Sequence, residues 1–236
     1  AAIAVGAATS GQVGSLQQLS LHGDVLHPWP LHAAALCGHG DVVAWLLEQR
    51  ADARARDRLP VTEWMPDNAW QQGHEWTPLH TAAWNGHGGI VRQLLHAKAD
   101  PAAVVNPCSS EPLPRVPQGR PGTGTELSTP LHLAACRGHV SVMEPLLQEA
   151  PHCTHKRDAG GATPLHRAAQ GGHIEVTQSL LGARADVQAE VRGAGRGWTP
   201  AAIAEASGHG ALAEVLQQAL QDSGHASRSR EMCVCS

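Results

Sequence analysis

The pattern Thr-Pro-Leu-His-x-Ala-Ala-x-x-Gly-His recurs along the chain and constrains its fold more than any other feature. Complete copies begin at Thr77, Thr129 and Thr163, and weaker copies begin at Trp29 and Thr199. The last three copies start 34 and 36 residues apart, a period that is typical of solenoid proteins. A unit of this length cannot bury its apolar face alone, so we expect the repeats to stack on one another.

Each copy predicts two helices. Thr is a favoured N-cap residue. Pro suits the first helical position that follows, because the backbone N–H it lacks would have no helical partner there. The Ala-Ala pair lets another helix approach closely, and the Gly before the second His suits a left-handed C-cap. Beyond each Gly-His, apolar residues recur at helical spacing, as at Ile90, Val91, Leu94 and Leu95, which predicts a second, more apolar helix.

These residues closely resemble the ankyrin-repeat family, most specifically where Thr-Pro-Leu-His and Gly-His occur in the same copy. The resemblance implies an all-α solenoid with short β-turn or hairpin fingers, of about five repeats plus an N-terminal half-repeat. We expect a single solenoid domain over 1–219 and a disordered C-terminal tail over 220–236. The half-repeat is expected at 1–22, and the repeats near 29–52, 76–101, 129–151, 160–187 and 197–219.

Two long insertions, 53–75 and 102–128, separate the early repeats, because the first two copy-to-copy intervals are 48 and 52 residues. Both fall between the turn that ends one repeat and the next Thr-Pro-Leu-His, where solenoids accept added residues on one face. We interpret the first insertion as an irregular loop, with a decayed repeat as the alternative. The second is rich in proline and glycine, a composition that cannot build a core.

The overall composition excludes several classes of function. The net charge of −4 argues against a protein that binds nucleic acid by neutralising phosphates, since such a protein needs a basic face. The sequence contains no apolar run long enough to cross a membrane. Its first residues lack the basic region of a secretory signal, so we expect none, and its six cysteines follow no disulfide framework. We therefore expect a monomeric intracellular protein, cytoplasmic or nuclear.

Sixteen histidines raise the question of catalysis or metal binding. Nine of them occupy the two fixed histidine positions of the repeat, and a catalytic group is needed once rather than once per repeat. We therefore predict structural roles for these nine and expect no enzyme, cofactor or metal site, since no catalytic motif or close-paired zinc spacing is present. The nine are His32, His39, His80, His87, His132, His139, His166, His173 and His209.

The family resemblance implies protein binding on the concave face formed by the fingers and the first helices. We name the two variable positions before each Gly-His the recognition strip; it comprises Leu36, Cys37, Trp84, Asn85, Cys136, Arg137, Gln170 and Gly171. Trp84 and Arg137 are of the types that most often anchor interfaces, although Trp84 packing against a neighbouring repeat is an equal alternative. Arg167 and the finger residues Lys156, Arg157 and Asp158 are expected to extend the strip.

Three functional hypotheses stay open on sequence alone. The first is a protein-interaction scaffold or adaptor with a partner of unknown identity. The second is the ankyrin portion of a larger enzyme, channel or acyltransferase, which the missing initiator Met allows. The third is a lipidated adaptor, because the last four residues, Cys233 to Ser236, formally match a prenylation signal at Cys233. Two chance thiols in a tail are the simpler interpretation of that signal.

Overall fold

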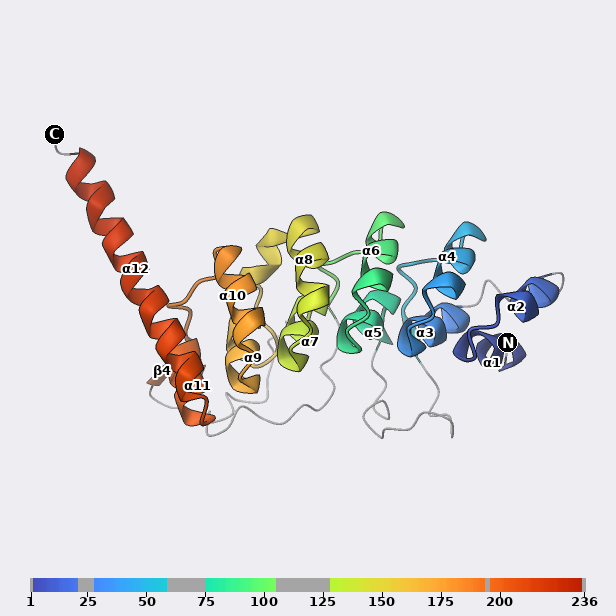
Figure 1. Ribbon diagram of the computed structural model, residues 1–236, viewed down its shortest axis with the longest axis horizontal. Coiled ribbons are helices and arrows are strands. Elements are labelled where there is room, and N and C mark those ends of the chain that lie inside the picture. Colours follow the sequence, from blue (N-terminus) through green and yellow to red (C-terminus); the bar gives the residue numbers. More distant parts are fainter. Residues whose placement is uncertain (1, 21–27, 59–74, 105–127, 194–195, 235–236) are drawn as a thin grey trace.

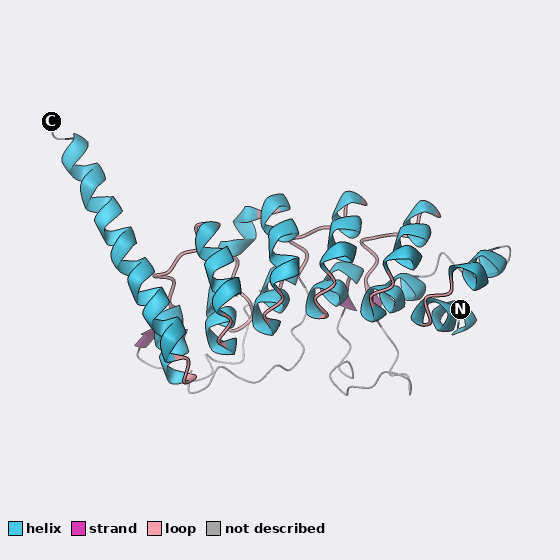
Figure 2. Ribbon diagram, in the orientation of Figure 1, coloured by secondary structure: helices cyan, strands magenta, loops and turns pink. Residues whose placement is uncertain are grey.

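The computed structural model describes residues 2–20, 28–58, 75–104, 128–193 and 196–234. Its helices form an elongated stack of antiparallel pairs (Figure 1), and its few strands are short (Figure 2). The predicted all-α solenoid with short fingers is therefore confirmed. The first helices are α1 (Ala2–Thr9), α3 (Pro28–Cys37), α5 (Pro78–Trp84), α7 (Pro130–Arg137), α9 (Pro164–Gly171) and α11 (Pro200–Ala206). The second helices are α2 (Val13–Ser20), α4 (Gly40–Glu48), α6 (Gly88–His96), α8 (Val140–Glu149), α10 (Ile174–Gly182) and α12 (Gly210–Val234).

The fingers contain the short strands. Strand β1 (Asp57–Arg58) pairs antiparallel with β2 (Glu75–Trp76), and β3 (Val191–Gly193) pairs antiparallel with β4 (Arg196–Trp198). A 3-10 helix, η3 (Pro151–His155), follows α8. The first insertion, predicted as an irregular loop, thus contains a strand near its start that pairs with a strand at its end. The interiors of both insertions, 59–74 and 105–127, lie outside the described residues.

The two ends of the stack differ from the expectations. The N-terminal segment, predicted as a half-repeat, contains both α1 and α2 and buries Ala8 and Leu16. At the other end, the backbone of α12 stays helical to Val234 and extends beyond the stack (Figure 1), although a disordered tail was predicted over 220–236. Burial of Leu212 and Leu216 anchors the start of this helix. Its later residues are mostly good helix formers and include no proline, so the helix can continue.

A continuous core runs between the two helix layers. The leucine of each Thr-Pro-Leu-His copy and the Ala-Ala pair behind it are buried, as at Leu79, Ala82 and Ala83. The second helices contribute the other side of the core. Within the predicted apolar stripe of α6, Leu94 is fully buried whereas Leu95 is only partly buried. The two adjacent leucines therefore differ in what they contribute to stability.

The histidine of Thr-Pro-Leu-His joins each repeat to the next finger. In α5 the N-cap Thr77 places its hydroxyl 2.7 Å from His80 Nδ1 and its backbone N–H 3.4 Å from the same nitrogen. Nδ1 therefore accepts, and Nε2 donates to a backbone carbonyl of the following finger or turn. These donations go from His32 to Trp76 O (2.9 Å), His80 to Ala103 O (3.1 Å), His132 to Ala162 O (3.1 Å) and His166 to Trp198 O (3.1 Å).

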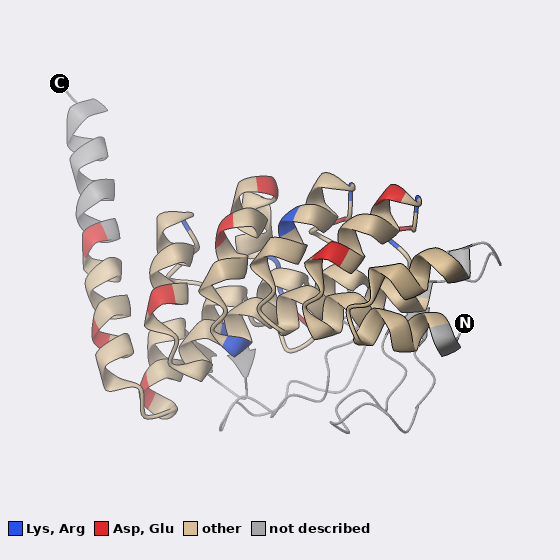
Figure 3. Cartoon of the chain, turned by 45° about the vertical axis from the view of Figure 1, so that its right-hand side comes forward, with Lys and Arg blue, Asp and Glu red and all other residues tan. Residues whose placement is uncertain are grey.

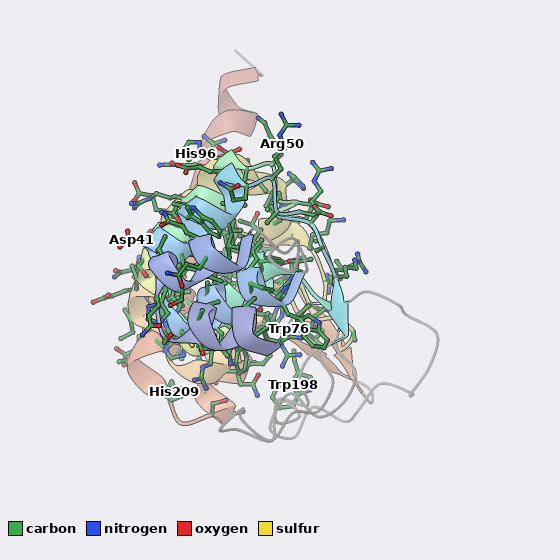
Figure 4. The ribbon with its side chains drawn as sticks, turned by 90° about the vertical axis from the view of Figure 1, so that its right-hand side faces the viewer. Asp41, Arg50, Trp76, His96, Trp198 and His209 are labelled. Atoms are coloured by element: carbon green, nitrogen blue, oxygen red, sulfur yellow. The ribbon has the colours of Figure 1, made fainter. Side chains whose placement is uncertain are left out.

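The histidine of Gly-His forms a second ladder that runs the opposite way along the chain. Each Nε2 donates to a carbonyl at the end of the preceding first helix, where helix carbonyls lack intrahelical partners. The bonds join His39 to Thr9 O (2.8 Å), His87 to Leu36 O (3.1 Å), His139 to Trp84 O (2.8 Å), His173 to Cys136 O (3.0 Å) and His209 to Gln170 O (3.2 Å). Viewed along the stack, Trp76 and Trp198 lie on one side and His209 toward the other (Figure 4). All nine predicted structural histidines are thus bonded between repeats.

The glycine of Gly-His is required for two reasons: its backbone is in the left-handed region, and the histidine of the next repeat lies against it. Both reasons lead to a stability prediction. Gly86 has φ +78°, and a Cβ there would lie 2.6 Å from Nδ1 of His139. Gly86→Ala should therefore lower the free energy of unfolding by at least about 1–2 kcal/mol. Gly89→Ala is the matched control, because Gly89 lies in α6 with nothing within 4 Å of its Cβ position, and it should stabilise by up to about 1 kcal/mol. Urea midpoints of the two variants that move in the same direction would contradict this account.

Pro145 lies inside α8, and the helix turn next to it packs against a glycine of the preceding repeat. As a proline it cannot donate to the carbonyl of Ser141. That carbonyl lies so close to Gly88 that a Cβ on Gly88 would collide with it, and the Ser141 hydroxyl donates to Gly86 O at 3.0 Å. The Ser141 carbonyl, which receives no helical hydrogen bond from Pro145, therefore packs against Gly88 at the start of α6. The absence of a side chain on Gly88 allows this close contact.

Candidate functional site

The recognition strip lies at the carboxyl ends of the first helices. Trp84 is the last residue of α5, and Asn85 follows as its C-cap. Arg137 ends α7, and Gln170 lies in the last turn of α9. Because the Gly-His ladder bonds the carbonyls of Leu36, Trp84, Cys136 and Gln170 to the following repeats, the backbone under these four residues is held in register along the stack.

Trp84 and Arg137 come from adjacent repeats and contact each other. The Arg137 guanidinium carbon lies 4.7 Å from the centroid of the Trp84 ring, within the range of a cation–π contact. Trp84 is half-buried and Arg137 is exposed. The structure therefore brings together the two strip residues of the types that most often anchor interfaces, and it leaves Arg137 exposed.

Trp76 supports Trp84 from the finger side. The rings of these two residues meet edge to face, with centroids 5.9 Å apart and planes at 79°. Trp76 is buried and is the residue directly before Thr77 in the sequence. Trp84 thus packs on Trp76 of its own repeat and contacts Arg137 of the next, and its role as an interface anchor stays a prediction. Sequence reasoning missed this role of Trp76, although an aromatic residue next to the N-cap threonine was a visible signal.

Arg167 has a different environment from Arg137. Its Nε and Nη2 atoms each lie 2.6 Å from Oδ2 of Asp158, and its Nη1 donates to the Gln170 side chain at 3.1 Å. The Asp158 side chain is 1% exposed. Its other oxygen accepts from the backbone N–H groups of Gly160 and Ala162. The expectation that Asp158 extends the binding strip is therefore wrong: this carboxylate is buried, orders the finger turn and neutralises Arg167.

Other residues of the strip contribute shape rather than charge. Leu36 is half-buried and Cys37 is exposed at the end of α3. Partial burial raises the pKa of the Cys37 thiol above its usual value, so this thiol stays protonated near neutral pH. The Asn85 amide donates to Thr81 O at 2.8 Å, which fixes its orientation. Cys233 lies on α12, but its side chain is outside the described part of the structure.

Acidic residues are unevenly distributed between the two helix layers (Figure 3). The second helices α4, α8, α10 and α12 carry Asp or Glu residues. The first helices α3, α5, α7 and α9 contain none, and only α11 carries one, Glu205. The layer that carries the recognition strip is therefore the less acidic face of an acidic protein.

A separate cavity of about 360 Å³ opens at the base of the fingers. Its walls combine the cationic residues Arg54, Arg56 and Lys98 with the carboxylates of Asp100 and Glu149. Because positive and negative side chains line the cavity in similar number, its charge favours neither an anionic nor a cationic ligand. In the chain segments that the structure covers, no cluster of three or more His, Cys, Asp or Glu residues could hold a metal ion. Likewise, no helix among the described residues is long and apolar enough to cross a membrane.

Comparison with protein families gives one match. The model of the family described as ankyrin repeats matches residues 5–104 and 118–191, in three copies. The match therefore spans the helices from α1 through α10 and includes every strip residue. A search of curated proteins found no match.

Proposed function

This chain belongs to the ankyrin-repeat family, whose repeats generally serve as protein–protein interaction modules, and we propose that it binds a partner protein on the concave face of its stack. The recognition strip and the fingers form the binding surface, and Trp84 and Arg137 are the anchors. Leu36, Cys37, Asn85, Cys136, Gln170 and, through its aliphatic stem, Arg167 complete the contact.

The observation that carries this proposal is the stacked pair of Trp84 and Arg137. An arginine that already rests on an aromatic ring loses less side-chain freedom on binding than one that is free in solvent. The two histidine ladders add to this effect, because they fix the backbone beneath the strip before a partner arrives. A preformed surface of this kind fits a scaffold or adaptor rather than an enzyme.

The proposal predicts that Arg137→Ala weakens partner binding at least tenfold, as the loss of an interface anchor does. The melting temperature should change little, because Arg137 is exposed and its guanidinium lies over the Trp84 ring rather than in the core. Partners captured from a cell lysate by the intact chain are identified, and their affinity for each variant is then measured directly. Wild-type affinity in Arg137→Ala would overturn the assignment of the site.

Trp84→Ala provides a second test with a different signature. It should reduce partner affinity and also cost about 1–3 kcal/mol of stability, because its ring packs against Trp76 as well as Arg137. The control is Arg92→Gln on α6, which removes an exposed positive charge on the opposite layer, where Arg92 lies 3.7 Å from Glu144. This control should leave partner affinity unchanged.

A further inference from the structure

The charged groups of the strip are not equivalent, and this difference points to the chemistry of the partner. The Arg167 side chain is 12% exposed, and its charge is neutralised by buried Asp158. Arg137 is exposed and stacks on Trp84. Among the described residues, no carboxylate lies within salt-bridge distance of Arg137. Arg137 therefore carries a positive charge that no described carboxylate neutralises, whereas the charge of Arg167 is neutralised.

The stack with Trp84 also leaves the Arg137 guanidinium suited to a particular ligand. The Arg137 guanidinium carbon lies over the Trp84 ring, 4.7 Å from its centroid, and the N–H donors that do not face the ring remain available to a ligand. A carboxylate accepts two such donors at once, in a planar bidentate pair. The stacking contact holds the arginine in place, so less conformational freedom is lost when the pair forms.

The surroundings of Arg137 are compatible with an incoming negative charge. The first helices α3, α5, α7 and α9 carry no Asp or Glu, so an acidic group meets no carboxylate from this layer. The second helices α4, α8 and α10 on the other face carry Asp or Glu (Figure 3) and would repel it. Charge complementarity thus favours the strip over the opposite face.

We propose that Arg137, held on Trp84, is the receptor for an Asp or Glu side chain of the partner, so that the chain recognises a protein segment with an acidic residue next to apolar ones. The half-buried Trp84 and Leu36 would contact the apolar neighbours. This inference rests on the proposed function and adds the chemical class of the partner segment to it.

The test uses random peptides displayed on phage and selected on the intact chain. We expect the selected peptides to share an Asp or Glu at one position. For one such peptide and its Glu→Gln or Asp→Asn form, affinity is then measured on the wild type and on Arg137→Gln. Loss of the carboxylate should weaken binding to the wild type roughly tenfold to hundredfold, as for hydrogen bonds to charged groups. On Arg137→Gln the same change in the peptide should have little effect.

Two further variants separate the possible outcomes. Arg137→Lys keeps the charge but not the planar pair of donors, so it should recover only part of the affinity, and Arg92→Gln should bind as the wild type does. If the selected peptides lack an acidic position, or if removing the carboxylate costs the same with and without Arg137, the inference is overturned. Peptides that still depend on Trp84 in that case would leave the proposed function intact. If no selected peptide depends on Trp84 or Arg137, the proposed function fails as well.

Discussion

Acidification from pH 7.5 to pH 5 should destabilise the folded stack by on the order of 6 kcal/mol through three buried histidines. Burial is the main reason that the pKa of His80 falls to about 3 and the pKa values of His132 and His166 fall to about 4, from an ordinary value of 6.5. In each case the native state holds a neutral imidazole, with Nδ1 accepting from the N-cap threonine and Nε2 donating to a carbonyl.

The direction of the effect follows from proton binding. Between about pH 6.5 and pH 4, the unfolded chain binds protons at these three positions and the native chain does not, so stability falls as the pH falls. At pH 5 each histidine contributes a loss of about 2 kcal/mol, since one unit between pH and the unfolded pKa is worth about 1.4 kcal/mol. The loss should be absent above about pH 7.5 and should level off below the native pKa values.

The measurement is the urea midpoint, followed by circular dichroism at pH 7.5, 6 and 5. His132→Gln should be less stable at pH 7.5, yet its stability should depend on pH about one third less steeply than that of the wild type. His152→Gln, at an exposed position in η3, is the control and should leave the slope unchanged. A midpoint that is the same at pH 7.5 and pH 5 would contradict the structural assignment of the three imidazoles.

Much of the fold was predictable because the repeat encodes its own contacts locally. Thr77, Pro78 and His80 determine a helix start within four residues, and the same residues recur at the copies that begin at Thr129 and Thr163. The repetition of the histidines also indicated a structural role for them, before any interatomic distance was known. The Nε2 partners of those histidines were not predictable, because each lies far away in sequence, in a finger or in another repeat. His80 illustrates this, since its acceptor Ala103 stands at the start of an insertion rather than directly before the next threonine.

The position of the proposed binding residues on the first helices was predictable, but the environment of each side chain was not. The two positions before Gly-His located Trp84 and Arg137 correctly at the ends of neighbouring first helices. The sequence does not distinguish Arg137 from Arg167, since both are arginines on first helices. They differ because Arg167 forms a salt bridge with the buried carboxylate of Asp158 in a finger, whereas Arg137 lies over Trp84. Side-chain pairing between a helix and a loop depends on tertiary geometry that no local pattern records.

A large loss of stability is expected from a substitution at Leu94. Leu94→Ala should lower the free energy of unfolding by about 2–5 kcal/mol, because this side chain is fully buried and its removal leaves a cavity. Its neighbour Leu95 belongs to the same predicted apolar stripe but is only partly buried, so Leu95→Ala should cost less than half as much. Comparing the two variants measures the effect of burial alone, since both substitutions remove the same atoms from consecutive positions of α6.

The consequences of Leu94→Ala should also spread along the stack. Helix α6 packs against both α4 and α8, and each repeat of a solenoid is stabilised chiefly by its neighbours. We therefore expect faster amide hydrogen exchange in α4 and α8 as well as in α6, with little change in α12, whereas Leu95→Ala should affect α6 alone. Equal urea midpoints for the two variants, or exchange that increases only within α6 after Leu94→Ala, would mean that the repeats are stabilised independently rather than by a continuous core.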